Sequence, residues 1–362
     1  MNEADERFEL EEQYRADQWK KLIVILILAL SLFIVTGLAL SYSEDSLSIF
    51  DCYRYVFDHI MGKTYEVGTD DWVHDYNIWK FDVPRVIMAI AVGGGLAICG
   101  VAMQSLMNNP LAEPYTAGIS DGACFGAVAA IVLGFGKATF GDSMGLVTSA
   151  FICGLIPAII IIFLSRVVRL TPATAILIGI AMSYLFSGLE SAVMVMTDPD
   201  TLKQAYLWQI GSLSKVNWTQ TEIAITVTLI CSAFLAYCSN KLNLLSLGDD
   251  SAKSLGLNVD NFRTLTMIVV SITVASTVSF VGIVGFVGLV APHMLRMLIG
   301  GDNKFLIPAS FLTGALFVQI ADTIAHNAFT PELRLGLLVS IIGSPIFLYI
   351  ILKKKKNYGE EL

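Results

Sequence analysis

Ten apolar segments, most of them long enough to cross a lipid bilayer, constrain this chain more than any other feature. A transmembrane helix needs about 20 predominantly apolar residues. Charged residues make up 15% of the chain, against about 25% in a typical soluble protein. We therefore expect an all-α integral membrane protein with about ten transmembrane helices, of which the eighth is too short for a straight crossing. The predicted spans are residues 22–41, 84–106, 117–134, 145–165, 172–196, 220–240, 263–281, 285–299, 306–324 and 334–352.

The distribution of Lys and Arg predicts the orientation of these spans. If the N-terminus lies inside and the spans alternate, fifteen of the 23 Lys and Arg residues fall in inside segments and eight outside. Among the inside residues are Arg166 and Arg169. Basic residues concentrate on the cytoplasmic side of membrane proteins. The prediction is a multi-pass protein of the cell (inner, cytoplasmic) membrane, with cytoplasmic tails at 1–21 and 353–362 and one ten-helix membrane domain at 22–352.

The longest polar stretch, residues 42–83, is acidic and is predicted to face outward. Within it, residues 46–61 mix apolar and polar side chains at helical spacing, which favours a helix lying on the surface. The first span follows a long acidic lead without a cleavage-site pattern, so we interpret it as an uncleaved anchor.

Motifs for chemistry within this chain are missing. Gly62-Lys63-Thr64 resembles the end of a phosphate-binding loop, but the position five residues before Gly62, where that motif needs glycine, is Phe57. The six cysteines have no metal-site spacing. We therefore expect no enzyme activity, no cofactor or metal site and no nucleic-acid partner in this chain. If ATP is used, ATP and Mg are bound by another chain.

Ionisable residues within the predicted spans are few and mark candidate functional positions: Glu190, His293, Arg296 and Asp322. An acid at the centre of a transmembrane helix costs roughly 2.5–3.5 kcal/mol on insertion scales, so it usually faces a polar cavity or a partner. Glu190 is a candidate for lining a transport pathway. The alternative is a hydrogen bond from Glu190 to a neighbouring helix.

The polar loop 241–262 is the strongest functional element in the sequence. Gly248 can end the sixth span, and Asp249 and Asp250 favour a helix N-terminus because their charge suits the positive end of the helix dipole. Gly256 can end the short helix that follows. A simple connector does not need this arrangement, so we predict a compact cytoplasmic helix on which another protein docks.

Several motifs, in order from about residue 80 to 352, resemble the FecCD-type permeases, the membrane subunits of binding-protein-dependent ABC importers for iron–siderophore complexes, haem and corrinoids. The matching stretches are VPR at 83–85, QSLMNNPLAEP at 104–114, WQIGSL at 208–213, LGDDSAKSLG at 247–256, GFVGLVAPH at 285–293 with Arg296, ADT at 321–323 and GSP at 343–345.

The resemblance implies partners and a mechanism. The expected partners are a second permease subunit, most simply a second copy of this chain, two ABC ATPase subunits inside, a solute-binding protein outside and membrane lipid. Cargo would cross by alternating access at the dimer interface. The ATPase-coupling residues implied by the resemblance are Leu247, Gly248, Asp249, Asp250, Ala252, Leu255 and Gly256.

The resemblance also places Arg85 where a basic side chain meets a glutamate of the binding protein. The family often has a second arginine where this chain has His326, and Arg334 lies nearby in place of a proline. Asp82 and Glu190 also depart from the family pattern. The expected cargo is an iron–siderophore complex, with haem or a corrinoid such as cobalamin as alternatives. An ion-coupled secondary transporter and an intramembrane enzyme are more distant alternatives.

Overall fold

The computed structural model describes residues 3–43, 47–134, 137–164, 171–329 and 333–359, and every regular element within these ranges is helical. Seven helices are long and apolar enough to cross a membrane, and three shorter apolar helices occupy the remaining predicted spans. The expected all-α architecture of ten apolar helices is confirmed. Arg166 and Arg169 lie outside the described residues.

Ten helices correspond to the predicted spans. They are α1 (Glu3–Ser43), α4 (Val83–Leu106), α5 (Ile119–Leu133), α6 (Lys137–Leu164), α7 (Pro172–Val195), α9 (Trp218–Tyr237), α12 (Val259–Val281), α13 (Val287–Ile299), α14 (Asn303–Asn327) and α15 (Leu335–Gly359). Shorter helices connect them: α2 (Ile49–Ile60), α3 (Asp70–Asn77), the π-helical η1 (Ile78–Asp82), the 3₁₀ turn η2 (Pro114–Ala117), α8 (Pro199–Gln209), α10 (Ser239–Leu245) and α11 (Asp249–Ser254).

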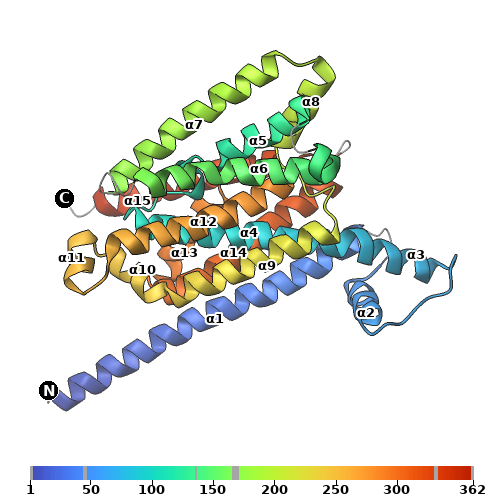
Figure 1. Ribbon diagram of the computed structural model, residues 1–362. Helices are drawn as coiled ribbons and strands as arrows, with labels where there is room; N and C mark the ends of the chain where they lie inside the picture. Colours follow the sequence, from blue (N-terminus) through green and yellow to red (C-terminus); the bar gives the residue numbers. More distant parts are fainter. Residues whose placement is uncertain (1–2, 44–46, 135–136, 165–170, 330–332, 360–362) are drawn as a thin grey trace.

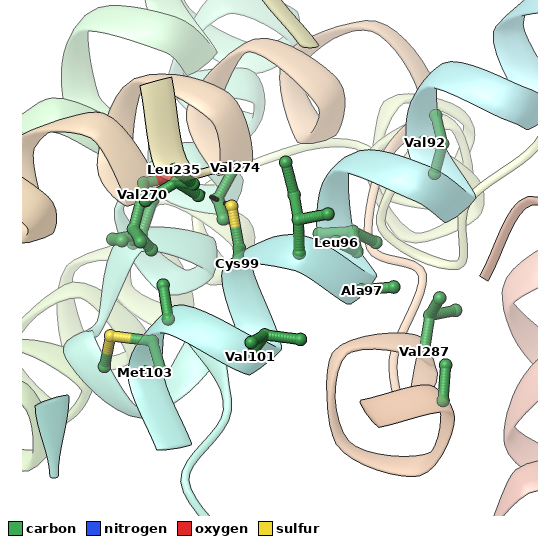
Figure 2. Packing of buried hydrophobic residues seen from close by; sticks show 14 of the residues in the cluster. Val92, Leu96, Ala97, Cys99, Val101, Met103, Leu235, Val270, Val274 and Val287 are labelled. Carbon is green, nitrogen blue, oxygen red and sulfur yellow. Dashed lines mark hydrogen bonds between the residues drawn. The ribbon is translucent and has the colours of Figure 1, made fainter. Parts of the chain in front are cut away.

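Helix α4 lies at the centre of the bundle and contacts α9, α12, α13 and α14 (Figure 1). The most apolar part of the helical stretch 70–106 is 89% buried, whereas the corresponding parts of α1 and α7 are 6% and 17% buried. Figure 2 shows Leu96 and Cys99 of α4 among residues of this core that include Val270 and Val274 of α12. Helices α1 and α7 therefore lie at the edges of the bundle.

Close backbone contacts hold α4 against two of its neighbours. A methyl group on Gly100 would overlap the carbonyl oxygen of Gly288 in α13, and one on Gly93 would overlap the carbonyl oxygen of Gly314 in α14. Lipid provides no hydrophobic force between helices, so small residues that allow close van der Waals contact are favoured at such crossings. Glycine is required at these crossings because any side chain would separate the two backbones.

The non-helical stretch 282–286, between α12 and α13, lies inside the bundle next to η2. The Tyr115 hydroxyl donates a hydrogen bond to the Val284 carbonyl oxygen at 3.0 Å, and Pro114 packs against Gly288. Helix α13 has 13 residues and begins only after this non-helical stretch. Irregular backbone is tolerated at membrane depth only where protein surrounds it or it lines a water-filled cavity, and Val284 is 1% exposed.

The two predicted tails continue the helices beside them. Helix α1 extends without a break from Glu3 through the first span, so the described part of 1–21 is helical. Helix α15 continues beyond the predicted end of its span to Gly359. The 42–83 segment contains the expected surface helix as α2, with Ser48 as its N-cap. Helix α2 packs on α1, and α3 follows it at the end of the bundle opposite α10 and α11 (Figure 1).

The glycine contacts predict how one added methyl group affects stability. Gly100→Ala should lower the apparent melting temperature of the purified protein, because overpacking a core costs about 1–3 kcal/mol. Gly188→Ala on α7 is the matched control, since no atom outside the adjoining backbone of α7 lies within 4 Å of the added Cβ. Equal melting temperatures for the two variants would contradict the role assigned to the α4–α13 contact.

Candidate functional site

The candidate functional site is the pair of short helices α10 and α11, here called the α10–α11 unit (residues 239–254), at one end of the bundle (Figure 1). The short helix predicted between two glycine breaks is confirmed as α11, which runs from Asp249 to Ser254. Gly248 has φ 97° and Gly256 has φ 88°. Residues other than glycine rarely adopt this left-handed backbone conformation, so the backbone geometry requires glycine at both positions.

The sixth span ends three residues before its predicted end, and a further short helix follows it. The span was expected to reach residue 240 and to be broken at Leu247–Gly248, but α9 ends at Tyr237 and α10 lies between the span and the break. Leu242 and Leu245 of α10 are 0% and 2% exposed, and α10 packs on α4 and α14. Burial of these leucines against α4 and α14 holds α10 on the bundle, and the sequence did not predict this helix.

The α10–α11 unit has an anchored side and a free side. Ala252 is fully buried, whereas Leu247 and Leu255, at either end of α11, are 63% and 61% exposed. Asp250 and Lys253 are also exposed. The helix is anchored on its buried side and exposes two leucines beside charged residues of both signs. Such a surface is suited to contact with another protein.

A buried arginine attaches α11 to two membrane helices. Arg263 of α12 is 1% exposed, and its guanidinium donates to both carboxylate oxygens of Asp249 at 2.7 and 3.1 Å. The same guanidinium donates to the carbonyl oxygen of Leu106 at the end of α4, at 3.3 Å. Bidentate arginine–carboxylate pairs fix geometry as well as adding energy. Asp249 is therefore a structural tie between α11, α12 and α4 and not a free surface charge.

A second polar network connects α10 with α13, α14 and the end of α4. The backbone N–H of Asn303 donates to the side-chain oxygen of Asn243 at 2.8 Å. The side-chain amide of Asn303 donates to the Ser105 hydroxyl at 3.2 Å. Arg296 donates to Gln104 at 3.2 Å and to Ser105 at 3.4 Å. Five polar side chains thus connect the α10–α11 unit to the adjacent ends of α4, α13 and α14.

Sequence reasoning missed the partners in these networks. It counted Arg263 only among the basic residues of the inside segments, and it gave Arg296 no partner. The detectable signal was an arginine at the boundary of an apolar span, 14 residues after an aspartate at a helix start. Which acid it meets depends on how α11 folds back, and spacing alone does not determine this.

At the opposite end of the bundle, Arg85 of α4 pairs with Asp322 of α14. The guanidinium Nε lies 2.7 Å from Oδ2 of Asp322, and Nη2 lies 3.0 Å from Oδ1. The two side chains are 16% and 11% exposed. Arg85, predicted to meet a partner protein, thus already holds an acid of its own chain, although guanidinium has five N–H donors and these two bonds use only two of them.

The other two predicted docking residues lie at the same end. His326 lines a small pocket together with Arg85, Asp322 and Asp82. The amide of Leu333, the residue before Arg334, donates to the carbonyl oxygen of Ala325, the residue before His326, at 3.2 Å. The structure therefore brings the three predicted positions to one end of the bundle, while their role in docking stays a prediction.

Glu190 accepts a hydrogen bond from the Gln209 side chain of α8 at 2.6 Å. This is the alternative considered from sequence, a hydrogen bond to a neighbouring helix. Sequence reasoning missed a second acid, Asp121 of α5, which accepts from Ser183 of α7 at 2.6 Å. Its signal was visible as an acid inside the third apolar span. These two bonds secure one side of α7, and most of α7 remains uncovered in a single copy of the chain.

Within the described ranges, no cluster of three or more His, Cys, Asp or Glu side chains has the arrangement needed to hold a metal ion.

The Arg263–Asp249 ion pair predicts that substitutions of two adjacent aspartates change the stability of the protein by different amounts. Asp249→Asn should destabilise the protein by about 1.5–3 kcal/mol, the range for hydrogen bonds to a charged group, because Arg263 loses its carboxylate. Asp250→Asn removes an equal charge from an exposed position and should change stability by less than about 0.5 kcal/mol. Thermal unfolding of both variants in detergent measures this difference, and equal stabilities would exclude the tie as a stabilising interaction.

Comparisons with known proteins agree with this architecture. The FecCD transport family model matches residues 18–353. An ABC transporter permease protein of Methanocaldococcus jannaschii is 37% identical, covering 96% of this chain and 99% of the relative. The hemin transport permease of Yersinia pestis is 35% identical, covering 78% and 85%. Other relatives are named for molybdate and cobalamin import.

A solved structure described as an inward-facing conformation of a metal-chelate type ABC transporter has a TM-score of 0.80 and 31% identity, covering 91% of this chain and 99% of that one. The family match spans nearly the whole chain, the two relatives described above are covered over 99% and 85% of their length, and the solved structure has the same fold. This chain is a multi-pass membrane protein that belongs to the FecCD transport family.

Proposed function

We propose that this chain is the permease subunit of an ATP-driven importer for an iron–siderophore complex. The observation that carries the proposal is the α10–α11 unit, which exposes Leu247 and Leu255 while Arg263 fixes it to the ends of α4 and α12. A separate ATPase subunit that contacts this surface could move it as a rigid body. In this proposal, ATP and Mg are bound by that partner and this chain is not an enzyme.

Motion of the α10–α11 unit has a short physical route into the bundle. The Asp249–Arg263 pair leads to α12 and α4, and Asn243 leads through Asn303 to α14 and Ser105. Packed helices and hydrogen-bond networks with two discrete arrangements can carry such coupling. We propose that closure of two ATPases shifts these helix ends together and switches the permease between outward- and inward-open states.

The transport pathway is proposed to lie between two permease subunits, most simply two copies of this chain. Helix α7 supports this arrangement because it packs on the bundle through α5 and η2, while the most apolar part of the helix is only 17% buried. Glu190 lies on this helix and stays a candidate for the border of the pathway. With the α10–α11 unit inside the cell, both termini are cytoplasmic and the 47–82 segment is outside.

The cargo class is proposed from the family, with haem or cobalamin as the alternatives because relatives are named for them. The experiment that decides the cargo is purification of the cognate binding protein with its bound ligand. An iron–siderophore complex has a charge-transfer absorption band and a mass that differ from those of haem and cobalamin. A haem or corrinoid spectrum would replace the proposed cargo without affecting the permease assignment.

Exposed leucines at the ends of α11 provide a direct test of ATPase coupling. The double variant Leu247→Asp and Leu255→Asp should insert normally but lose most ATP-dependent uptake in proteoliposomes, because charge replaces the apolar contacts. Leu247→Met with Leu255→Met is the matched control and should retain uptake. Co-elution with the ATPase subunits, ATP hydrolysis and uptake are measured together.

Normal coupling in the double aspartate variant would contradict the assignment of this surface.

Vanadate and an ionophore test the energy source in the same vesicles. Uptake that survives vanadate but stops with an ionophore would indicate an ion-coupled transporter instead.

Docking of an extracytoplasmic binding protein is proposed to use Arg334 and the remaining donors of Arg85, with His326 beside them. Arg334→Glu should slow association most at low ionic strength, because rim charges act mainly on the association rate. Stopped-flow association across a salt series is the measurement. Arg85→Glu is a poorer test because it also places a second acid against Asp322.

Asp322→Asn provides the control for this internal effect, since it breaks the same ion pair without reversing the charge at residue 85. An association rate unchanged by Arg334→Glu at low salt, together with equal rates for Asp322→Asn and Arg85→Glu, would remove both arginines from the docking site.

A further inference from the structure

Helix α2 has three distinct faces. Its apolar face is exposed, with Phe50 86%, Phe57 60% and Ile60 61% exposed. A second face, with Cys52 and Tyr55, is buried against the chain. The third face carries charged residues. Such a division is typical of a helix that contacts protein, water and a third, apolar medium.

Contacts with α1 hold α2 in a defined position. Tyr53 stacks on Phe33, with ring centroids 4.5 Å apart and an interplanar angle of 4°, and its hydroxyl donates to the Phe33 carbonyl oxygen. A methyl group on Gly37 would overlap the side chain of Ile49 and come within 2.7 Å of Tyr53. The exposed face of α2 is therefore presented by a closely packed helix pair.

An apolar groove of about 590 Å³ runs between the two helices. Phe33 and Ile34 of α1 form one wall, and Phe50, Val56, Phe57 and Ile60 of α2 contribute to the other. Water in a groove lined in this way would leave a large apolar surface hydrated, which is unfavourable.

The groove continues a surface that lipid must cover. Helix α1 is a membrane-spanning candidate whose most apolar part is only 6% buried, and Leu26, Ile27 and Leu30 on it are 69%, 56% and 59% exposed. Phe33 and Ile34 extend this exposed face by one turn, at 58% and 48%. The same side chains then form the wall of the groove.

The position along α1 gives the depth of the groove. Ala39 shares a pocket with Arg85 and Asp322, whose charges mark the polar end of the bundle. Phe33 lies six residues deeper, which is about 9 Å at 1.5 Å per residue. Interfacial amphipathic helices bury their apolar faces about 5–10 Å into the boundary between headgroups and acyl chains.

The charged face of α2 suits the water side of this boundary. Asp58 accepts hydrogen bonds from Lys63 and Tyr65, each at 2.7 Å, and Arg54 lies 3.4 Å from Asp51. These groups are paired with one another on the side of α2 away from the groove.

We propose that α2 is an interfacial helix whose apolar face lies among the acyl chains of the adjacent leaflet, and that the α1–α2 groove holds a phospholipid acyl chain. The anchor holds the acidic segment 47–82 on the α1 side of the bundle. Neither the position of α2 nor this ligand depends on the transported cargo.

The test places a fluorescent probe on each side of the proposed boundary. Phe57→Cys and Ile60→Cys are labelled with an environment-sensitive dye in a background without the six native cysteines, and the chain is reconstituted in phospholipid nanodiscs. Val67→Cys is the matched control, because Val67 is also apolar and 77% exposed but lies in the loop after α2. Quenching by brominated acyl chains and by aqueous iodide is compared.

Probes at 57 and 60 should be quenched several-fold more by brominated lipid than the probe at 67, and less by iodide. Iodide quenching equal to that at 67 would place the face in water and overturn the proposal. Protection from both quenchers would show that protein covers the face, which also overturns it.

A second measurement needs no substitution in α2. Phospholipid with a photoreactive group in its acyl chain is crosslinked to the unaltered chain, and the labelled residues are mapped by mass spectrometry. Labels should occur at Phe50, Val56 and Phe57 and not at Val67. Gly37→Leu, which pushes α2 from α1, should remove the label at Val56, whereas Ala29→Leu on the exposed side of α1 should not. Absence of labels on α2 in the unaltered chain would overturn the proposal.

Discussion

Backbone contacts between glycines along α4 are the constraint on which the rest of the structure depends. Gly93 meets Gly314 and Gly100 meets Gly288 so closely that no side chain fits at either crossing. Because association in lipid relies on close packing and polar contacts, these crossings fix α13 and α14 against α4. Helices α9 and α12 complete the core around α4, and the less buried helices α1 and α7 attach to this rigid centre.

The polar networks at the α10–α11 end depend on the same centre. Leu106, Ser105 and Gln104 form the last turn of α4, and Arg263, Asn303 and Arg296 reach them from three other helices. Buried polar groups are costly unless paired, so each of these side chains restricts where its neighbours can lie. A surface held by these pairs moves with the helix ends beneath it, which is the mechanical property that the proposed ATPase contact needs.

The end of the bundle opposite α10 and α11 is held together differently. It combines a largely buried ion pair with a peripheral helical segment. Arg85 and Asp322 join α4 to α14, and Trp218 donates to the Trp79 carbonyl oxygen at 2.8 Å, which joins η1 to α9. The acidic segment 47–82 thus attaches to the α1 side of the bundle, away from α7 and α8 (Figure 1). If both proposals hold, the lipid anchor on α2 keeps this negative charge beside the docking surface and not across it.

The sequence by itself determined the ten apolar helices, the short helix α11 and its glycine boundaries, because hydrophobic length and left-handed backbone positions are local properties. It also placed Arg85, His326 and Arg334 at one end, through the order of the spans. Only the tertiary structure decided that Asp249 meets Arg263, that Asp322 meets Arg85, that Glu190 meets Gln209 and that α10 turns the chain at Cys238. These contacts join residues up to 237 positions apart, and their partners are chosen by helix packing, which local spacing does not encode.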